Sequence, residues 1–122
     1  MPHERLQEFV IIDYTKELVI LAIVAREEKE EIMGVGQYAI DEATHTAEVG
    51  LVVKDDDQNR GIGTELLSYL TYLAKRQGLL GFNAEVLVEN KPMLHVFEKI
   101  GFDIRKRISE DVYELKVSFK EI

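Results

Sequence analysis

Hydrophobic residues in the first half of the chain occur in short runs separated by charged turns, a pattern typical of β-strands. The run Leu18 to Ala25 is unbroken and rich in β-branched residues, so it predicts a strand that is covered on both faces. Two further runs, Ile32 to Ile40 and Ala47 to Val53, follow after short polar segments. Together the three runs predict a β-meander.

The middle of the chain changes to a helical period. Apolar residues recur every three or four positions between Gly61 and Gln77, which predicts an amphipathic helix that Gly78 ends. A second helix is predicted over Lys91 to Ile100, because Pro92 stands in its first turn and Gly101 follows its last residue. The two helices interrupt a sequence that is otherwise rich in strands.

The remaining apolar runs also predict strands. Ala84 to Val88 lies between the two helices, and Phe102 to Arg107 with Val112 to Phe119 forms a final hairpin. The predicted order is βββαβαββ, which is an α/β (α+β) domain. No repeat, linker or low-complexity segment divides the 122 residues, so we expect a single domain over residues 1–122.

Composition narrows the possible functions. With 46% apolar and 31% charged residues, the chain is expected to fold, and the absence of cysteine excludes disulfides, thiolate metal ligands and a cysteine nucleophile. The three histidines have no ligand spacing, so no metal is expected. A net charge of −8 disfavours a nucleic acid partner and mildly favours a cationic substrate. No apolar run approaches the ~20 residues of a membrane span, and Met1 to Glu8 is charged, so a cytoplasmic location is the default expectation.

The candidate chemistry lies where the third strand meets the first helix. The segment from Val52 to Thr64 reads as a strand end, an acidic loop, and a turn in which Gly61 and Gly63 open the helix. A helix N-terminus has backbone N–H groups without helical partners and carries the positive end of the dipole, so such a turn suits a phosphate. A simple tight turn fits the same glycines. The Walker pattern and the three-glycine dinucleotide fingerprint are both absent.

Two motifs give this junction a more specific meaning. Gln58, Gly61 and Gly63 match Gln/Arg-x-x-Gly-x-Gly/Ala, and the segment from Asn90 to Phe102 begins with asparagine and ends in Glu-Lys-Ile-Gly-Phe. Both resemble motifs of the GNAT N-acetyltransferase superfamily, in the family's order. The resemblance runs from about Phe9 to Phe119 and is strongest to the GNAT domains of bacterial protein lysine acetyltransferases, with a shortened N-terminus. It implies a GNAT fold with a mixed, mostly antiparallel sheet flanked by helices, one of which can precede the first strand.

The resemblance also implies a place for acetyl-CoA, the expected co-substrate. The third strand would pair with the pantetheine arm, the glycine turn would hold the pyrophosphate, and the strands ending near Val53 and Val88 would splay apart around the arm. The thioester would end near Glu48 and Phe97. The residues assigned in this way to cofactor binding are Leu51, Val52, Val53, Gln58, Asn59, Arg60, Gly61, Ile62, Gly63, Thr64, Asn90 and Phe97.

The reaction implied by the resemblance is direct transfer of an acetyl group to a primary amine, with a protein lysine as one candidate acceptor. At pH 7 a lysine needs about 4.6 kcal/mol to reach its neutral, nucleophilic form, so a base is useful. Glu48 is the catalytic candidate, because it interrupts a small, apolar strand and matches a position that resembles the general base of related lysine acetyltransferases. The alternative interpretation of Glu48 is a solvent-facing strand residue.

The chain departs from the family pattern at two points. Phe97 stands where the family often has a tyrosine that protonates the departing thiolate, so no general acid is assigned. Family members usually begin with one more strand and one or two helices that shape the acceptor pocket, whereas only about ten residues precede the second-strand region here. A missing strand would leave an exposed sheet edge, and this motivates the hypothesis of a homodimer. The alternative function is that of a non-catalytic module, which would act by binding acyl-CoA or as a regulatory domain.

Overall fold

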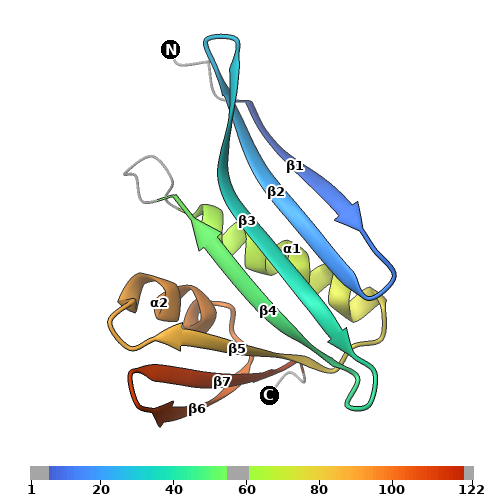
Figure 1. Ribbon diagram of the computed structural model, residues 1–122, viewed down its shortest axis with the longest axis vertical. Helices are drawn as coiled ribbons and strands as arrows, with labels where there is room; N and C mark the ends of the chain where they lie inside the picture. Colours follow the sequence, from blue (N-terminus) through green and yellow to red (C-terminus); the bar gives the residue numbers. More distant parts are fainter. Residues whose placement is uncertain (1–5, 55–60, 120–122) are drawn as a thin grey trace.

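The computed structural model describes residues 6–54 and 61–119, and within them the chain forms one seven-stranded sheet and two helices (Figure 1). The sheet order is β1-β2-β3-β4-β5-β7-β6, with every neighbouring pair antiparallel except β4 and β5. The elements are β1 (Leu6–Asp13), β2 (Glu17–Arg26), β3 (Lys29–Asp41), β4 (Thr46–Val53), α1 (Ile62–Arg76), β5 (Gly81–Leu87), α2 (Lys91–Lys99), β6 (Asp103–Ser109) and β7 (Val112–Ser118). The predicted class and the predicted order from β2 onward are confirmed.

The N-terminal segment is the main difference from the sequence prediction. Leu6–Asp13 forms β1, which pairs with β2 along its whole length, and the Tyr14 N–H donates to the Glu17 carbonyl at 2.8 Å in the connecting turn. The expectation that the first strand is missing is therefore wrong, and no helix precedes β1 in the described part of the chain. The run Phe9 to Ile12 is itself a strand signal of four β-forming residues, and pairing with β2 extends the strand to Leu6–Asp13.

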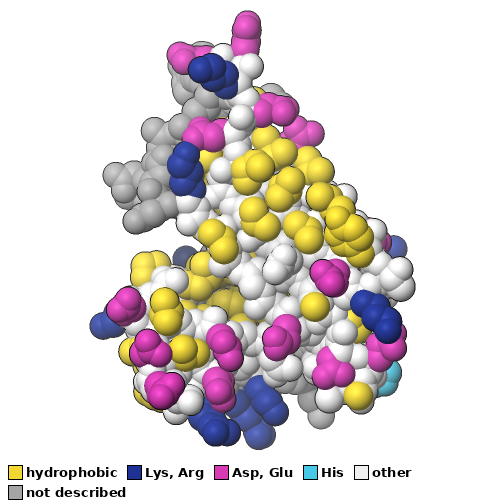
Figure 2. Space-filling model, viewed as in Figure 1, with side chains coloured by type: hydrophobic (Ala, Val, Ile, Leu, Met, Phe, Trp, Pro, Cys, Tyr) yellow, Lys and Arg dark blue, Asp and Glu magenta, His cyan; other side chains and the backbone are white. Residues whose placement is uncertain are grey.

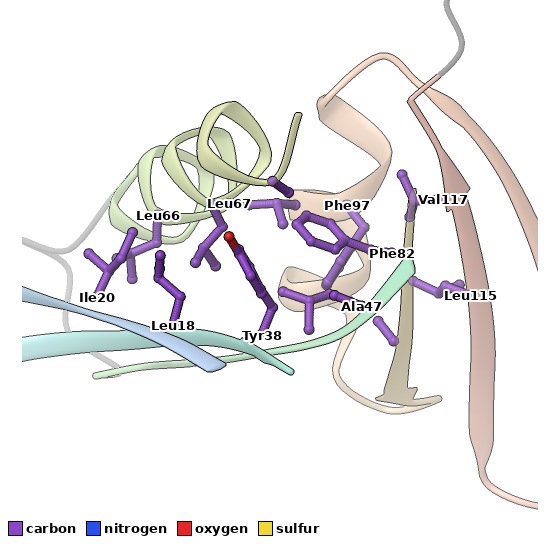
Figure 3. Close-up of a cluster of buried hydrophobic side chains, with 14 of the residues drawn as sticks. Leu18, Ile20, Tyr38, Ala47, Leu66, Leu67, Phe82, Phe97, Leu115 and Val117 are labelled. Carbon is purple, nitrogen blue, oxygen red and sulfur yellow. The ribbon is translucent and has the colours of Figure 1, made fainter. Parts of the chain in front are cut away.

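Both helices pack on the same face of the sheet. Figure 3 shows side chains of α1 and α2 pointing toward side chains from the strands, and Phe97 of α2 lies within this buried cluster. Two glycines on β3 bring α1 close: a Cβ at Gly34 would lie 3.0 Å from Leu66 Cδ1, and one at Gly36 would lie 2.8 Å from Leu70 Cδ1. The glycines within this strand thus serve helix packing.

The opposite side of β1 to β4 is called the outer face here. On β2, the side chains facing α1 are buried, whereas Val19, Leu21 and Ile23 between them are half-buried. No described helix or strand covers the outer face, and Figure 2 shows it as a broad group of hydrophobic side chains. The prediction that Leu18 to Ala25 is covered on both faces is therefore wrong for the described structure, because apolar residues here alternate between a packed and an open face.

Candidate functional site

A gap between β4 and β5 is the feature that organises the site. All eight residues of β4 pair with β3, but only Thr46–Glu48 pairs with β5, in parallel with Gly81–Asn83. Beyond these three pairs the strands diverge, and β5 pairs with β7 along its other side. Over residues 49–53, one side of the β4 backbone therefore has no strand partner in the described ranges. The sequence prediction that these strands splay apart is confirmed.

The N-terminus of α1 follows the open end of this gap. Gly61 is its N-cap residue with φ of 86°, a left-handed conformation that favours glycine, and a Cβ placed there would meet no atom within 4 Å. Because Gly61 has no side chain, it cannot cap the helix with a side-chain hydrogen bond. The first hydrogen bond of the helix runs from the Glu65 N–H to the Gly61 carbonyl, at 2.9 Å. The N–H groups of the first turn precede that bond, so they have no acceptor within the helix. This turn has the properties of an anion site.

The neighbouring glycine has a different environment. A Cβ at Gly63 would lie 3.3 Å from Val96 Cγ2 and 3.4 Å from Val53 Cγ2, so this glycine lets α1 pack tightly against α2 and β4. Ile62 is buried beside it and Thr64 is half-buried. The predicted ligand contacts of Ile62 and Gly63 would therefore have to come from their backbone.

Three other residues of the predicted phosphate turn cannot be placed. Gln58, Asn59 and Arg60 lie outside the described residues. The placed part of the predicted site at this end consists of Leu51 to Val53 on β4 and Gly61 to Thr64 on α1. These two segments flank the gap on one side.

On the other side of the gap, α2 carries two predicted site residues. Asn90 is the N-cap of α2, and its Oδ1 accepts a hydrogen bond from the Met93 N–H at 3.2 Å. Sequence reasoning missed this capping role, although asparagine before a helix with proline in its first turn is typical of an N-cap. Phe97 is only 2% exposed and lies in the core, between α2 and the sheet (Figure 3).

Glu48 is exposed on the outer face, opposite the helices. It lies at the closed end of the gap, where its cross-strand neighbours are Ala39 on β3 and Asn83 on β5. A cavity of about 360 Å³ opens here, and we call it the Glu48 cavity. Its lining residues are Glu48, Val49, Asn83, Ala84, Glu85, Glu114, Leu115 and Lys116.

The Glu48 cavity is acidic. Three carboxylates line it, from Glu48, Glu85 and Glu114, against one ammonium group, from Lys116. Glu85 and Glu114 are direct cross-strand partners, and Glu114 Oε1 lies 3.8 Å from Arg107 Nε on β6. Such a cavity attracts a cationic ligand more than an anionic one. Sequence reasoning missed Glu85 and Glu114, since the pairing of β5 with β7 brings them together and no local pattern encodes that pairing.

Two other types of site find no support in the part of the chain that the structure describes. No cluster of three or more His, Asp or Glu side chains there has an arrangement suited to a metal ion. Neither described helix has the length and apolar character required to cross a membrane.

The chain is similar in sequence to known acetyltransferases. A model of the acetyltransferase (GNAT) family matches residues 2–102. The chain is 42% identical over 55 residues to "Acetyltransferase Pat" of Mycolicibacterium smegmatis, a match that covers 45% of this chain and 16% of that protein.

Several solved structures share the overall fold of this chain. The GNAT domain of S. lividans PAT superposes with a TM-score of 0.73 at 25% identity, covering 88% of this chain and 64% of that one. Spermidine N-acetyltransferase from Vibrio cholerae, in complex with CoA and spermine, has a TM-score of 0.69 at 18% identity, which supports the fold alone, and the match covers 85% of this chain and 66% of that one. The chain thus spans only part of the length of these relatives.

Proposed function

Because the chain belongs to the acetyltransferase (GNAT) family, we propose that it binds acetyl-CoA between β4 and β5 and transfers the acetyl group to a primary amine. The observation that carries this proposal is the gap between these strands, which runs from the N-terminus of α1 to the Glu48 cavity. The gap is open at the end where the N-terminus of α1 can bind an anion. It is closed at the other end, where the carboxylates of the Glu48 cavity lie.

The chemistry of the gap fits an extended ligand with a phosphate at one end. The unpartnered side of β4 from Val49 to Val53 can accept an amide-containing arm as an added strand. The first turn of α1, with open space above Gly61, suits the pyrophosphate. Gln58 to Arg60 and Asn90 stay predictions as further contacts.

Two protons leave the acceptor nitrogen in the proposed reaction: the ammonium ion first loses one to solvent to become the neutral nucleophile, and the second leaves as the C–N bond forms. Acetyl-CoA supplies an acetyl thioester as the co-substrate. The neutral acceptor nitrogen attacks the carbonyl carbon, so that a C–N bond forms as the C–S bond breaks. Glu48 takes the proton from nitrogen directly or through a water molecule, and the departing thiolate takes one from solvent. Backbone N–H groups near Val49 to Leu51 would stabilise the carbonyl oxygen.

The Glu48 cavity supports a cationic acceptor. Its three carboxylates lie where the acceptor would enter, and they favour an amine that arrives as an ammonium ion. A lysine side chain and a polyamine both meet this condition. The resemblance of the sequence motifs to those of bacterial protein lysine acetyltransferases favours the lysine, and a polyamine is the second acceptor to test.

The non-catalytic alternative has one specific observation in its favour. Phe97 has no ionisable group and is buried, so it offers no acid to the leaving thiolate. A module of this kind would bind acetyl-CoA without turnover. A cytoplasmic location and a homodimer also stay predictions, although β1 now occupies the sheet edge that motivated the dimer.

The variant Glu48→Gln tests the enzymatic proposal. We expect it to lower kcat/KM for a polyamine or lysine-peptide acceptor about 100-fold, because a general base typically contributes that much, while the Kd for acetyl-CoA stays unchanged. Glu17→Gln is the matched control, since Glu17 is also exposed on the outer face and shares its β3 neighbour, Ala39, with Glu48. Equal rates for the two variants would remove Glu48 from the mechanism. Binding of acetyl-CoA without transfer to any amine would favour the non-catalytic module.

A further inference from the structure

The outer face carries an apolar surface that the proposed acetyl transfer does not use. Strand register aligns its side chains in rows across β1, β2 and β3. One row runs Ile12, Val19, Gln37, the next Val10, Leu21, Val35, and the third Glu8, Ile23, Ile32. Ile12 is 36% exposed and Ile32 is 53% exposed, although both lie within strands. We call the apolar members of these rows the outer apolar patch.

An apolar surface of this kind is usually buried against another element or a partner. An antiparallel sheet with one packed face usually has polar side chains on the other, and soluble domains rarely expose a large contiguous apolar area. Here the same strands are packed against α1 on one side, while on the other none of the described elements covers them (Figures 1 and 2).

The border of the patch is mostly acidic, and the lysines next to these strands, Lys16 and Lys54, are ion-paired with Glu42 and Glu31. Within β1 to β4, every described charged side chain on the outer face is a carboxylate, and these residues are Glu8, Glu17, Glu30, Asp41 and Glu48. Two copies of the chain stacked through this face would bring like charges together, which opposes self-association. A partner with basic residues beside an apolar stripe is complementary in charge.

The dimensions of the patch favour a helix. Three adjacent strands are about 10 Å wide, and the four residue steps from Val19 to Ile23 are about 13 Å long. An α-helix is about 10 to 12 Å in diameter and rises 1.5 Å per residue, so roughly nine residues would cover the patch. One amphipathic helix of about three turns therefore matches it in both width and length.

We propose that the outer apolar patch binds an amphipathic α-helix of a partner, with an apolar stripe that packs on the patch and Lys or Arg beside it that face the acidic border. The helix completes a layer on the second face of the sheet. It would also lie next to the Glu48 cavity, because Glu48 forms part of that border. The inference rests on the sheet and its charges and is independent of acetyl transfer.

A pair of synthetic peptides tests the proposal on the wild-type protein. Each is a 14-residue amphipathic helix with the same leucine stripe, flanked by lysines in one peptide and by glutamates in the other. We expect calorimetric titration to give one-to-one binding of the lysine peptide and binding at least tenfold weaker for the glutamate peptide. In the complex, NMR shift changes should fall on β1, β2 and β3. Equal affinities, or shift changes elsewhere, would overturn the proposal.

Two protein variants locate the binding surface. Ile32→Ser removes an exposed apolar side chain from the patch and should weaken the lysine peptide at least tenfold. Tyr72→Ser is the control, since Tyr72 is 55% exposed on α1, on the other side of the sheet, and should leave binding unchanged. Equal binding by both variants would contradict the proposal. So would a dimer by light scattering that dissociates in Ile32→Ser, because a second copy would then be the occupant.

Discussion

Gly61 and Gly63 lie two positions apart in one motif but meet different physical demands. Gly61 adopts a left-handed conformation with open space where a side chain would be, whereas Gly63 is fixed by contact with Val96 and Val53. Sequence reasoning assigned both to the approach of a phosphate. The structure supports open space only at Gly61, because the spacing of two glycines does not say which one faces solvent.

Gly81 has the strictest steric requirement among the glycines. A Cβ there would lie 2.1 Å from the Val117 carbonyl oxygen, which is backbone and cannot rotate away. We expect Gly81→Ala to lower the free energy of unfolding by about 2 to 4 kcal/mol, measured by chemical denaturation. The control is Gly50→Ala, whose Cβ meets nothing within 4 Å and should change stability by less than about 0.5 kcal/mol. Similar stabilities for the two variants would contradict the packing described at the start of β5.

The catalytic candidates illustrate what residue patterns reveal and what they conceal. Glu48 stands out in the sequence, because a carboxylate interrupts an apolar strand. Glu85 and Glu114 have equally plain strand positions but become neighbours only through the pairing of β5 with β7. Their shared place in one cavity is a long-range property and has no local signal.

At the scale of elements, helices and central strands follow from the sequence because their patterns are local. The 3.6-residue period places α1 to within one residue at each end. Most of the predicted strands are shorter than the observed ones; β3, for example, begins at Lys29 because hairpin pairing extends it into charged residues. The strand β1 was not predicted, although Phe9 to Ile12 is a run of four β-forming residues.

The contact between α2 and β6 gives a pH-dependent prediction. Lys106 Nζ lies 2.8 Å from Glu98 Oε2, and this hydrogen bond and the charge of Lys106 lower the pKa of Glu98 from its ordinary value of 4.5. Because the folded pKa lies below the unfolded one, the pair stabilises the fold above the unfolded pKa, and this contribution disappears as the pH falls through the folded pKa.

An NMR titration measures this effect directly. Lys106→Met should raise the pKa of Glu98 back toward 4.5, whereas Lys99→Met, which removes a neighbouring charge on α2, should change it less. An unchanged pKa of Glu98 in Lys106→Met would show that the ion pair does not form in solution.

At the scale of the whole molecule, one sheet serves two different surfaces. The face that carries α1 and α2 holds the core, and the gap between β4 and β5 connects the N-terminus of α1 with the Glu48 cavity on the outer face. The family motifs predicted this gap from the sequence. The open outer face could not be predicted, because a continuous apolar run such as Leu18 to Ala25 is equally typical of a strand covered on both sides.

The most direct test of the central claim is calorimetric titration with acetyl-CoA of the wild type, Gly61→Glu and Gly78→Glu. Both glycines have positive φ, 86° and 83°, and open space at the Cβ position, so the two substitutions introduce the same charge and similar backbone strain at opposite ends of α1. We predict near one-to-one, micromolar binding to the wild type, at least tenfold weaker binding to Gly61→Glu, and little change for Gly78→Glu. Absence of binding to the wild type, or equal affinities of the two variants, would contradict the placement of acetyl-CoA at the N-terminus of α1.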